Sequence, residues 1–258
     1  MVSWHGAPPT HAVLPTLTTA GVRHAFTTRQ QGSFDAVSAP AGPFGHDRRW
    51  PALAALRLEP SSVRYARQVH SDTCLDADAL DSGGLVGTGD ALITRERMRP
   101  LAIFTADCVP LIVADPEGSA LGVAHAGWRG TLRGVAGRLV AALAALPGVR
   151  VERLRAAIGP SIGPCCYEVD EPVVTPLRAA FPESWERWVR PVASAHPARP
   201  DHWWFDLWAA NAHQLVAAGV PPGAILSPRL CTGCRRDLFF SYRKEGLAGR
   251  LGTFAALD

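Results

Sequence analysis

The stretch Leu121–Leu146, LGVAHAGWRGTLRGVAGRLVAALAAL, holds a strand, a turn and a helix in direct succession. The apolar run Leu121–Ala124 predicts a buried strand. Further along, apolar residues recur at the spacing of one helix face, which predicts a helix that ends before Pro147. These residues are Leu132, Val135, Leu139, Leu143 and Leu146. The segment between them, Ala124–Thr131, therefore leaves a strand and enters a helix.

Short apolar runs on both sides of this stretch predict further strands. They are Val22–Thr27, Arg64–Val69, Ala91–Thr94, Leu101–Thr105, Leu111–Ala114, Leu154–Ile158, Leu238–Tyr242 and Thr253–Leu257. We expect a helix at Leu207–Ala218, starting near Asp206 and stopping at Gly219, and a proline-interrupted helix at Glu171–Phe181. Many strands with few helices favour an α+β fold, in which sheets pack on each other and helices lie outside.

The chain shows no composition change that would divide it. Loops are expected at Gly32–Asp47 and at His196–Asp201, where Gly, Pro and Ser gather. Neither loop separates two segments of different composition. We therefore expect a single domain over residues 1–258.

Composition narrows the class of protein. The 258 residues are 47% hydrophobic and 19% charged, which is typical of a globular chain. A formal net charge of +3 is too small to indicate a nucleic-acid partner. No segment reaches the ~18 apolar residues of a membrane span. The first ten residues do not resemble a secretory signal, so we expect a cytoplasmic protein with reduced cysteines and no disulfide.

Three segments end apolar runs with groups that bind metals or act as nucleophiles: Gln68–Ser71, Thr105–Pro110 and Ala124–Thr131. They carry His70, Cys108 and His125. Two imidazoles and a thiolate suit zinc, and three protein ligands leave a fourth position open, as in catalytic sites. Asp107 is a candidate acceptor for an imidazole N–H. The alternative is a buried cysteine and two histidines that only pack.

The segment after His125 has the features of an anion site. Gly127 and Gly130 allow a close approach of the backbone to a ligand, and the following helix points free N–H groups the same way. Arg129 adds a planar fork suited to phosphate or carboxylate. The alternative is a glycine-rich turn with a solvated arginine.

Four further cysteines are interpreted as structural or incidental. Cys231 and Cys234 have the C-x-x-C spacing of a redox pair or of half a zinc site, but no second C-x-x-C is present. Cys165 and Cys166 are adjacent, and adjacent residues do not easily supply two ligands to one tetrahedral ion. Cys74 is interpreted in the same way.

These motifs resemble those of one family. QVHS, TADCVPLIVAD, AHAGWRGT, IGPSIGPCCYEVD, CTGC and FFSYRKEGLAGR follow in order from about Phe26 to the C-terminus. They resemble the purine nucleoside phosphorylase family of the YfiH/YlmD/FAMIN type, first described as multicopper polyphenol oxidases or laccase-domain proteins. The resemblance implies a four-layer α/β/β/α sandwich. It also implies a metal site formed by His70, Cys108 and His125, usually with zinc, and copper is the other candidate metal.

The same resemblance implies phosphorolysis of adenosine, inosine and S-methyl-5′-thioadenosine, together with deamination of adenosine. Purine nucleosides and phosphate would then be the partners, and we favour a monomer. Arg129, Arg29, Arg243 and Gly127 are the candidates for holding phosphate or substrate. We favour Cys108 as a metal ligand over Cys108 as a nucleophile, with about one zinc per chain. Residues 30–47 depart from the family pattern, which puts the nucleoside preference in doubt.

Three other functions stay open. Copper-dependent polyphenol oxidation needs several copper sites, whereas this chain has nine histidines and no H-x-H pair. An amide hydrolase would use Cys108 with a histidine base. A non-enzymatic zinc-binding protein would not need an open coordination position.

Overall fold

The computed structural model describes residues 1–34, 42–44, 50–117, 119–192 and 201–258. Much of the two loops expected at residues 32–47 and 196–201 therefore lies outside the described residues. Three sheets carry the fold. The largest has seven strands, in the order β1 (Ser3–His5), β2 (His11–Val13), β3 (Val22–Thr27), β16 (Leu251–Leu257), β8 (Leu101–Thr105), β4 (Arg64–Arg67) and β6 (Gly84–Thr88).

The second sheet has six strands and contains the strand that begins the stretch Leu121–Leu146. Its order is β15 (Ile225–Leu226), β11 (Arg155–Ile158), β9 (Val109–Ala114), β10 (Leu121–Ala126), β7 (Ala91–Thr94) and β5 (Cys74–Asp76). Strand β10 lies between β9 and β7, antiparallel to both. All six of its residues are buried, as expected for a central strand covered on both faces.

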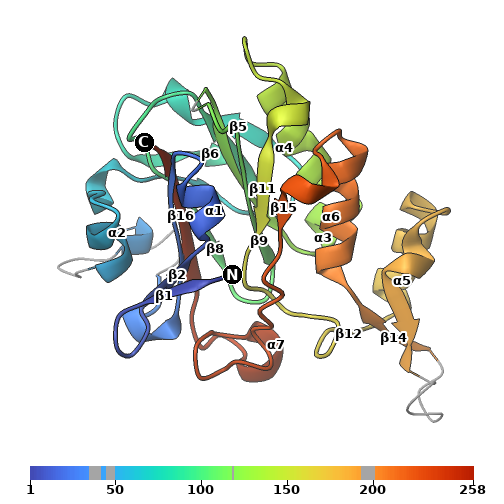
Figure 1. Ribbon diagram of the computed structural model, residues 1–258. Coiled ribbons are helices and arrows are strands. Elements are labelled where there is room, and N and C mark those ends of the chain that lie inside the picture. The colour runs from blue at the N-terminus through green and yellow to red at the C-terminus, as the bar shows by residue number, and fades with distance from the viewer. Residues whose placement is uncertain (35–41, 45–49, 118, 193–200) are drawn as a thin grey trace.

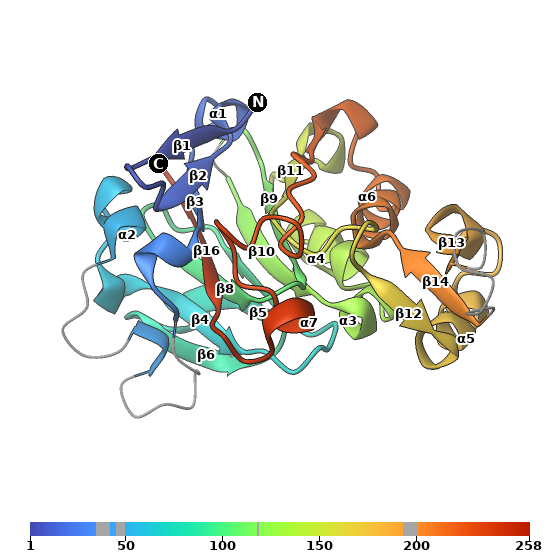
Figure 2. The same ribbon diagram turned by 90° about the horizontal axis from the view of Figure 1, so that it is seen from below.

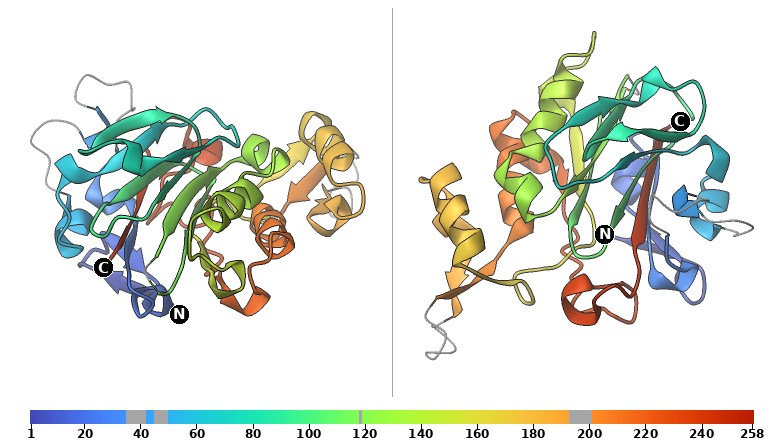
Figure 3. Two further views of the ribbon diagram at one scale, coloured as in Figure 1. Left: turned by 90° about the horizontal axis from the view of Figure 1, so that it is seen from above. Right: turned by 180° about the vertical axis from the view of Figure 1, so that it is seen from behind.

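Helices cover the outer faces of the two large sheets (Figure 1). On the six-stranded sheet lie α3 (Trp128–Leu132), α4 (Val135–Ala144) and α6 (Leu207–Ala217). On the seven-stranded sheet lies α2 (Pro51–Ala55), whose Leu53 packs with Phe104 and Phe254. The two large sheets share a core, in which Ile103 of the seven-stranded sheet packs with Ile112 and Val123 of the six-stranded sheet. This order of layers confirms the expected α/β/β/α sandwich and is also visible from above and behind in Figure 3.

A small third sheet lies beside the sandwich (Figure 2). It has the order β12 (Glu168–Asp170), β14 (His202–Phe205) and β13 (Val189–Pro191), and α5 (Glu171–Ala180) follows β12 directly. Two further α-helices are short: α1 (Pro15–Thr18) and α7 (Tyr242–Glu245). No helix in the described ranges is both long and apolar enough to cross a bilayer.

Most of the expected long elements are confirmed, and α6 begins as expected, with the Asp206 side chain accepting a hydrogen bond from the Ala209 N–H at 3.0 Å. Two expectations are wrong. The long helix after β10 is split, because Gly134 adopts φ +80° between α3 and α4. Leu238–Tyr242 is not a strand: the N–H groups of Leu238 and Phe239 both donate to the Arg235 carbonyl, which makes a turn.

Candidate functional site

His70 lies in a loop that two anchors hold in place. Strand β4 ends at Arg67, and the Gln68 amide then exchanges two hydrogen bonds, of 2.7 and 2.8 Å, with the backbone of Phe104 in β8. His70 itself adopts a positive φ of 61°, which few residues other than glycine occupy. The bend turns the N–H groups of Val69, His70 and Ser71 toward one carboxylate, that of Asp90. The loop therefore has a fixed shape.

Asp90 is a buried acceptor directly before β7. Its Oδ2 accepts from the Val69 N–H, the Ser71 N–H and the Ser71 hydroxyl. Its Oδ1 accepts from the His70 N–H at 3.0 Å and lies 2.8 Å from His125 Nδ1. Burial disfavours the charged form, but the hydrogen bonds from His125 and Ser71 hold the pKa of Asp90 well below its usual range. Asp90 is thus an anion that holds the backbone of His70 and the ring of His125.

Sequence analysis missed Asp90 and proposed Asp107 as the imidazole acceptor, which is wrong. The two oxygens of Asp107 accept instead from the Thr232 hydroxyl and the Arg243 N–H, both at 2.6 Å. Asp107 also has a positive φ, of 83°. Its role is to hold the sharp turn between β8 and β9 that presents Cys108. The signal available for Asp90 was a lone acidic residue at the start of an apolar strand, which has no specificity by itself.

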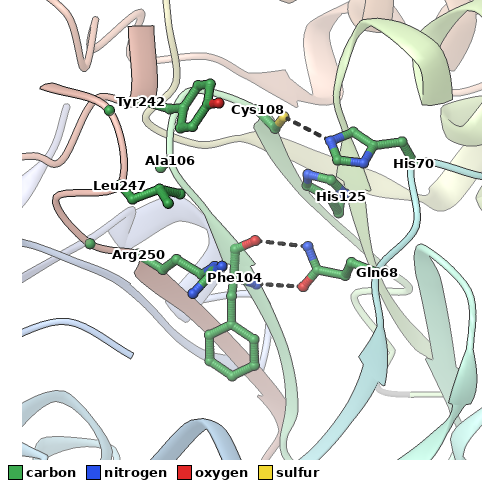
Figure 4. A pocket seen from close by; sticks show the side chains of 11 residues that line it. Gln68, His70, Phe104, Ala106, Cys108, His125, Tyr242, Leu247 and Arg250 are labelled. Atoms are coloured by element: carbon green, nitrogen blue, oxygen red, sulfur yellow. Dashed lines mark hydrogen bonds between the residues drawn. The ribbon is translucent and has the colours of Figure 1, made fainter. Parts of the chain in front are cut away.

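His125 lies near the end of β10 and completes a cluster with the other two side chains. One ligand atom from each of the three residues lies within 4.8 Å of the others, and Cys108 Sγ is 3.9 Å from His70 Nε2. The rings of His70 and His125 are 4.8 Å apart and nearly perpendicular. Figure 4 shows Cys108 and both rings converging at one side of a pocket. The structure therefore brings together all three residues that sequence analysis singled out.

The electrostatics of the cluster favour a thiolate beside an imidazolium when no metal is bound. Burial alone would raise the pKa of Cys108, but His125 and His70 lower it to about 6. Burial alone would lower the pKa of His125, but Cys108 and Asp90 raise it to about 10. A metal ion would replace the imidazolium proton as the partner of the thiolate.

The geometry fits a metal ion of borderline softness. Nδ1 of His125 is directed at Asp90, so the lone pair on Nε2 of His125 is free to bind a metal ion. Gly127 lies directly against the cluster, because a Cβ built on it would come 2.8 Å from Cys108 Sγ and 2.9 Å from His70 Cδ2. Gly127 was expected to border a phosphate. Its neighbours in the structure are two of the three candidate metal ligands.

A cavity of about 460 Å³ opens beside the cluster. Its lining includes Gln68, all three cluster residues, Tyr242 and Arg250. Tyr242 is 59% exposed and Leu247, also in the lining, is 87% exposed. Figure 4 shows these two side chains and Arg250 on one segment, facing the cluster across the pocket. A cavity of this size suits a small organic ligand, with apolar side chains and a cation on one wall and the Cys–His–His cluster on the other.

Arg250 is the arginine in the cavity lining, and sequence analysis did not select it. Among the described residues, no group forms a hydrogen bond or ion pair with its guanidinium. In the sequence, Arg250 is the last residue of the motif FFSYRKEGLAGR, which was used only as evidence for the family resemblance. Arg250 is exposed, as Arg129 is, but it lines the cavity, and a cation without a protein partner there is available to an anionic ligand.

The three arginines that were selected lie outside the cavity lining. Arg129 is exposed, with its guanidinium 4.2 Å from the Trp128 ring. Arg29 pairs with Glu245 at 3.1 Å. Arg243 donates to the carbonyl of Glu168. Helix α3 has only five residues, so its N-terminus offers less to an anion than the long helix that was expected.

The chain is similar to several known proteins. Residues 46–258 match the family described as multi-copper polyphenol oxidoreductase laccase. A purine nucleoside phosphorylase of Xylella fastidiosa strain 9a5c is 38% identical over 254 residues, which cover 96% of this chain and 93% of that protein. Adenosine deaminase RL5, from an unknown prokaryotic organism, is 39% identical over 218 residues, covering 80% and 79%. The crystal structure of YlmD from Geobacillus stearothermophilus is similar with a TM-score of 0.82 and 29% identity, covering 100% and 99%.

Proposed function

Because this chain belongs to the multi-copper polyphenol oxidoreductase laccase family, which includes relatives named for purine nucleoside chemistry, we propose that it is a zinc-dependent purine nucleoside phosphorylase. The substrates are adenosine, inosine and S-methyl-5′-thioadenosine, each with phosphate. The observation that carries the proposal is the Cys–His–His cluster at the side of a cavity that also holds Arg250, whose guanidinium has no partner among the described residues.

Phosphorolysis makes two demands that the cavity can meet. The C1′–N9 bond of the nucleoside breaks as a phosphate oxygen bonds to C1′, and the base leaves with the electron pair. Phosphate must be held against C1′, and Arg250 offers two parallel N–H donors for it. The base must be oriented, and the exposed Tyr242 ring and Leu247 side chain offer an apolar platform at the cavity mouth.

On the opposite wall, His70, Cys108 and His125 would hold the zinc ion. Bound there, zinc supplies a Lewis acid facing the ligand. Asp90 keeps Nδ1 of His125 protonated and aligned, so that Nε2 stays directed at the ion. Gln68 does not contact substrate through its amide, since both ends of that amide are occupied by the Phe104 backbone. Its part is to hold the His70 loop.

Adenosine deamination is the second candidate, because a relative covering most of the chain is named adenosine deaminase. It needs water in place of phosphate and no anion site. The two reactions therefore differ in their dependence on phosphate and on Arg250.

The test is a panel of the three nucleosides, with and without phosphate, followed by identification of products. Free base and ribose 1-phosphate (or its 5′-methylthio analogue) formed only with phosphate support phosphorolysis, and inosine formed from adenosine without phosphate supports deamination. Oxidation of a phenol by copper-loaded protein, with no nucleoside turnover, would point instead to the oxidase of the family description.

Arg250→Lys is the variant that tests the phosphate site. Lysine keeps the charge and loses the fork. Loss of one charge-assisted hydrogen bond, about 1.5–3 kcal/mol, corresponds to about a ten- to hundredfold slower phosphorolysis. Arg129→Lys is the matched control outside the cavity. Slower phosphorolysis in Arg129→Lys alone, with metal content unchanged in both, would move the phosphate site to Arg129, the residue favoured by the sequence.

A further inference from the structure

Four cysteines that sequence analysis set aside meet at one point of the fold. Their Sγ atoms all lie within 4.8 Å of one another, although they come from two segments far apart in the chain. The four are Cys165, Cys166, Cys231 and Cys234. Cys234 Sγ is 3.4 Å from Cys165 Sγ and 3.5 Å from Cys166 Sγ. This cluster shares no residue with the Cys–His–His cluster.

The backbone brings these two segments together by specific contacts. Ser161 and Cys231 form a parallel bridge, in which the Ser161 N–H donates to the Leu230 carbonyl and the Thr232 N–H donates back to the Ser161 carbonyl, both at 3.1 Å. The N–H of Gly163 donates to Cys231 Sγ at 3.2 Å. Donation of a backbone N–H to sulfur favours the thiolate, which is the form that binds metal.

The adjacent pair Cys165–Cys166 can supply two ligands because it lies in a tight turn. The N–H groups of Cys166 and Tyr167 both donate to the Gly163 carbonyl at 2.9 Å. Within that turn both adjacent sulfurs lie close to Cys234. Gly233 faces this pair, and a Cβ built on it would come 2.9 Å from Cys166 Cβ. Glycine at this position of the C-x-x-C segment therefore lets the two segments approach.

The sulfur positions suit a tetrahedral ion better than a disulfide. With Zn–S bonds of about 2.3 Å, tetrahedral geometry places sulfurs about 3.8 Å apart. The Sγ–Sγ distances of 3.4 and 3.5 Å are near that spacing, and a disulfide would join only two of the four sulfurs at ~2.0 Å. Cys231 is buried while Cys165 and Cys234 are exposed, which gives an ion a path from solvent. We infer that these four cysteines bind one zinc ion in a closed, structural site.

Such an ion would also support the candidate active site. Thr232, between two of the ligands, donates its hydroxyl to Asp107. Asp107 has a positive φ and directly precedes Cys108. An ion that holds the C-x-x-C segment in place therefore also holds Thr232, the hydrogen-bond partner of Asp107 in the turn that presents Cys108. The inference does not depend on which reaction the cavity performs.

The experiment measures metal in the full-length protein as isolated and again after loading with Cd²⁺. We expect two metal equivalents per chain in the wild type and one in Cys108→Ala. X-ray absorption of the metal left in Cys108→Ala should show four sulfur neighbours. Cys234→Ser, or Cys165→Ser if the first does not fold, should lose that all-sulfur component and keep one equivalent. Cys74→Ser, at a cysteine outside both clusters, should keep two.

Three results would overturn the inference. The first is Cys108→Ala protein that binds no metal while its thiols stay free. The second is a remaining metal with nitrogen or oxygen neighbours that Cys234→Ser does not displace. The third is a stoichiometric disulfide from Cys234 to Cys165 or Cys166 in freshly isolated protein, which would also contradict the expectation of reduced cysteines.

Discussion

Asp90→Asn tests the claim that one carboxylate organises the Cys–His–His cluster. Asp90 accepts five hydrogen bonds, three on Oδ2 and two on Oδ1. Asparagine replaces one of these oxygens with an NH₂ group, which cannot accept. Whichever way the amide turns, at least two donors lose their acceptor. If Oδ1 is the atom replaced, these two are the His70 N–H and His125 Nδ1.

The expected magnitude follows from that count. A hydrogen bond to a charged group contributes about 1.5–3 kcal/mol, so two lost bonds lower the free energy of unfolding by about 3–6 kcal/mol at most. Metal affinity should fall about ten- to hundredfold, because groups that orient a ligating histidine have effects of that size. That fall is about 1.4–2.8 kcal/mol of binding free energy.

The assay is competition for Zn²⁺ with a chromophoric chelator at pH 7, on protein whose folding is checked by circular dichroism. Asp115→Asn is the matched control. Asp115 is also a buried carboxylate with a backbone and a hydroxyl donor, from Glu117 and Ser119, and it lies outside the cavity lining. Equal metal affinity in the two variants, at equal loss of stability, would refute a specific role for Asp90.

Two further predictions concern the same cluster. Gly127→Ala should weaken zinc binding in the chelator assay, because the new methyl group would lie 2.8 Å from Cys108 Sγ. The control is Gly137→Ala in α4, where the new methyl group meets open space. This variant should keep its zinc affinity and have a higher melting temperature. In chelator-treated protein, iodoacetamide should alkylate Cys108 at a rate that is half-maximal near pH 6 and decreases at lower pH. The reason is that the lowered pKa keeps Cys108 a thiolate above about pH 6. Cys74, whose pKa burial raises to about 12, should react slowly throughout, and equal pH profiles for the two thiols would contradict the assignment.

The sequence predicts the long buried elements because each is an apolar run with clear limits. Strands β3, β7 and β8 match their expected bounds residue for residue. Leu238–Tyr242 was misassigned because three consecutive buried residues, which here pack as a small cluster with Leu251, look locally like a strand. Strands of two or three residues, such as β15, carry no periodicity that could be recognised.

The candidate site was predictable only where side-chain chemistry was specific. His70, Cys108 and His125 could be selected because thiol and imidazole groups at strand ends are few. Arg129 was selected because it lies beside His125 and before a helix, whereas nothing in the sequence indicates that Arg250 lies in the cavity lining. The four-cysteine cluster depends on the bridge between Ser161 and Cys231, a contact of the folded chain that spacing along the sequence does not reveal.

The Cys–His–His cluster joins the two large sheets. His70 follows a strand of the seven-stranded sheet, His125 lies within the six-stranded sheet, and Cys108 is in the turn that passes from one to the other. The relative position of the sheets, set by residues such as Ile112 and Val123, therefore sets the distances between the three side chains. A displacement of about 1 Å at a reacting centre can cost about a hundredfold in rate. Saturation mutagenesis scored for activity should therefore show a second group of intolerant positions between the sheets, remote from the cavity. At these positions, volume changes too small to unfold the chain should still slow the reaction.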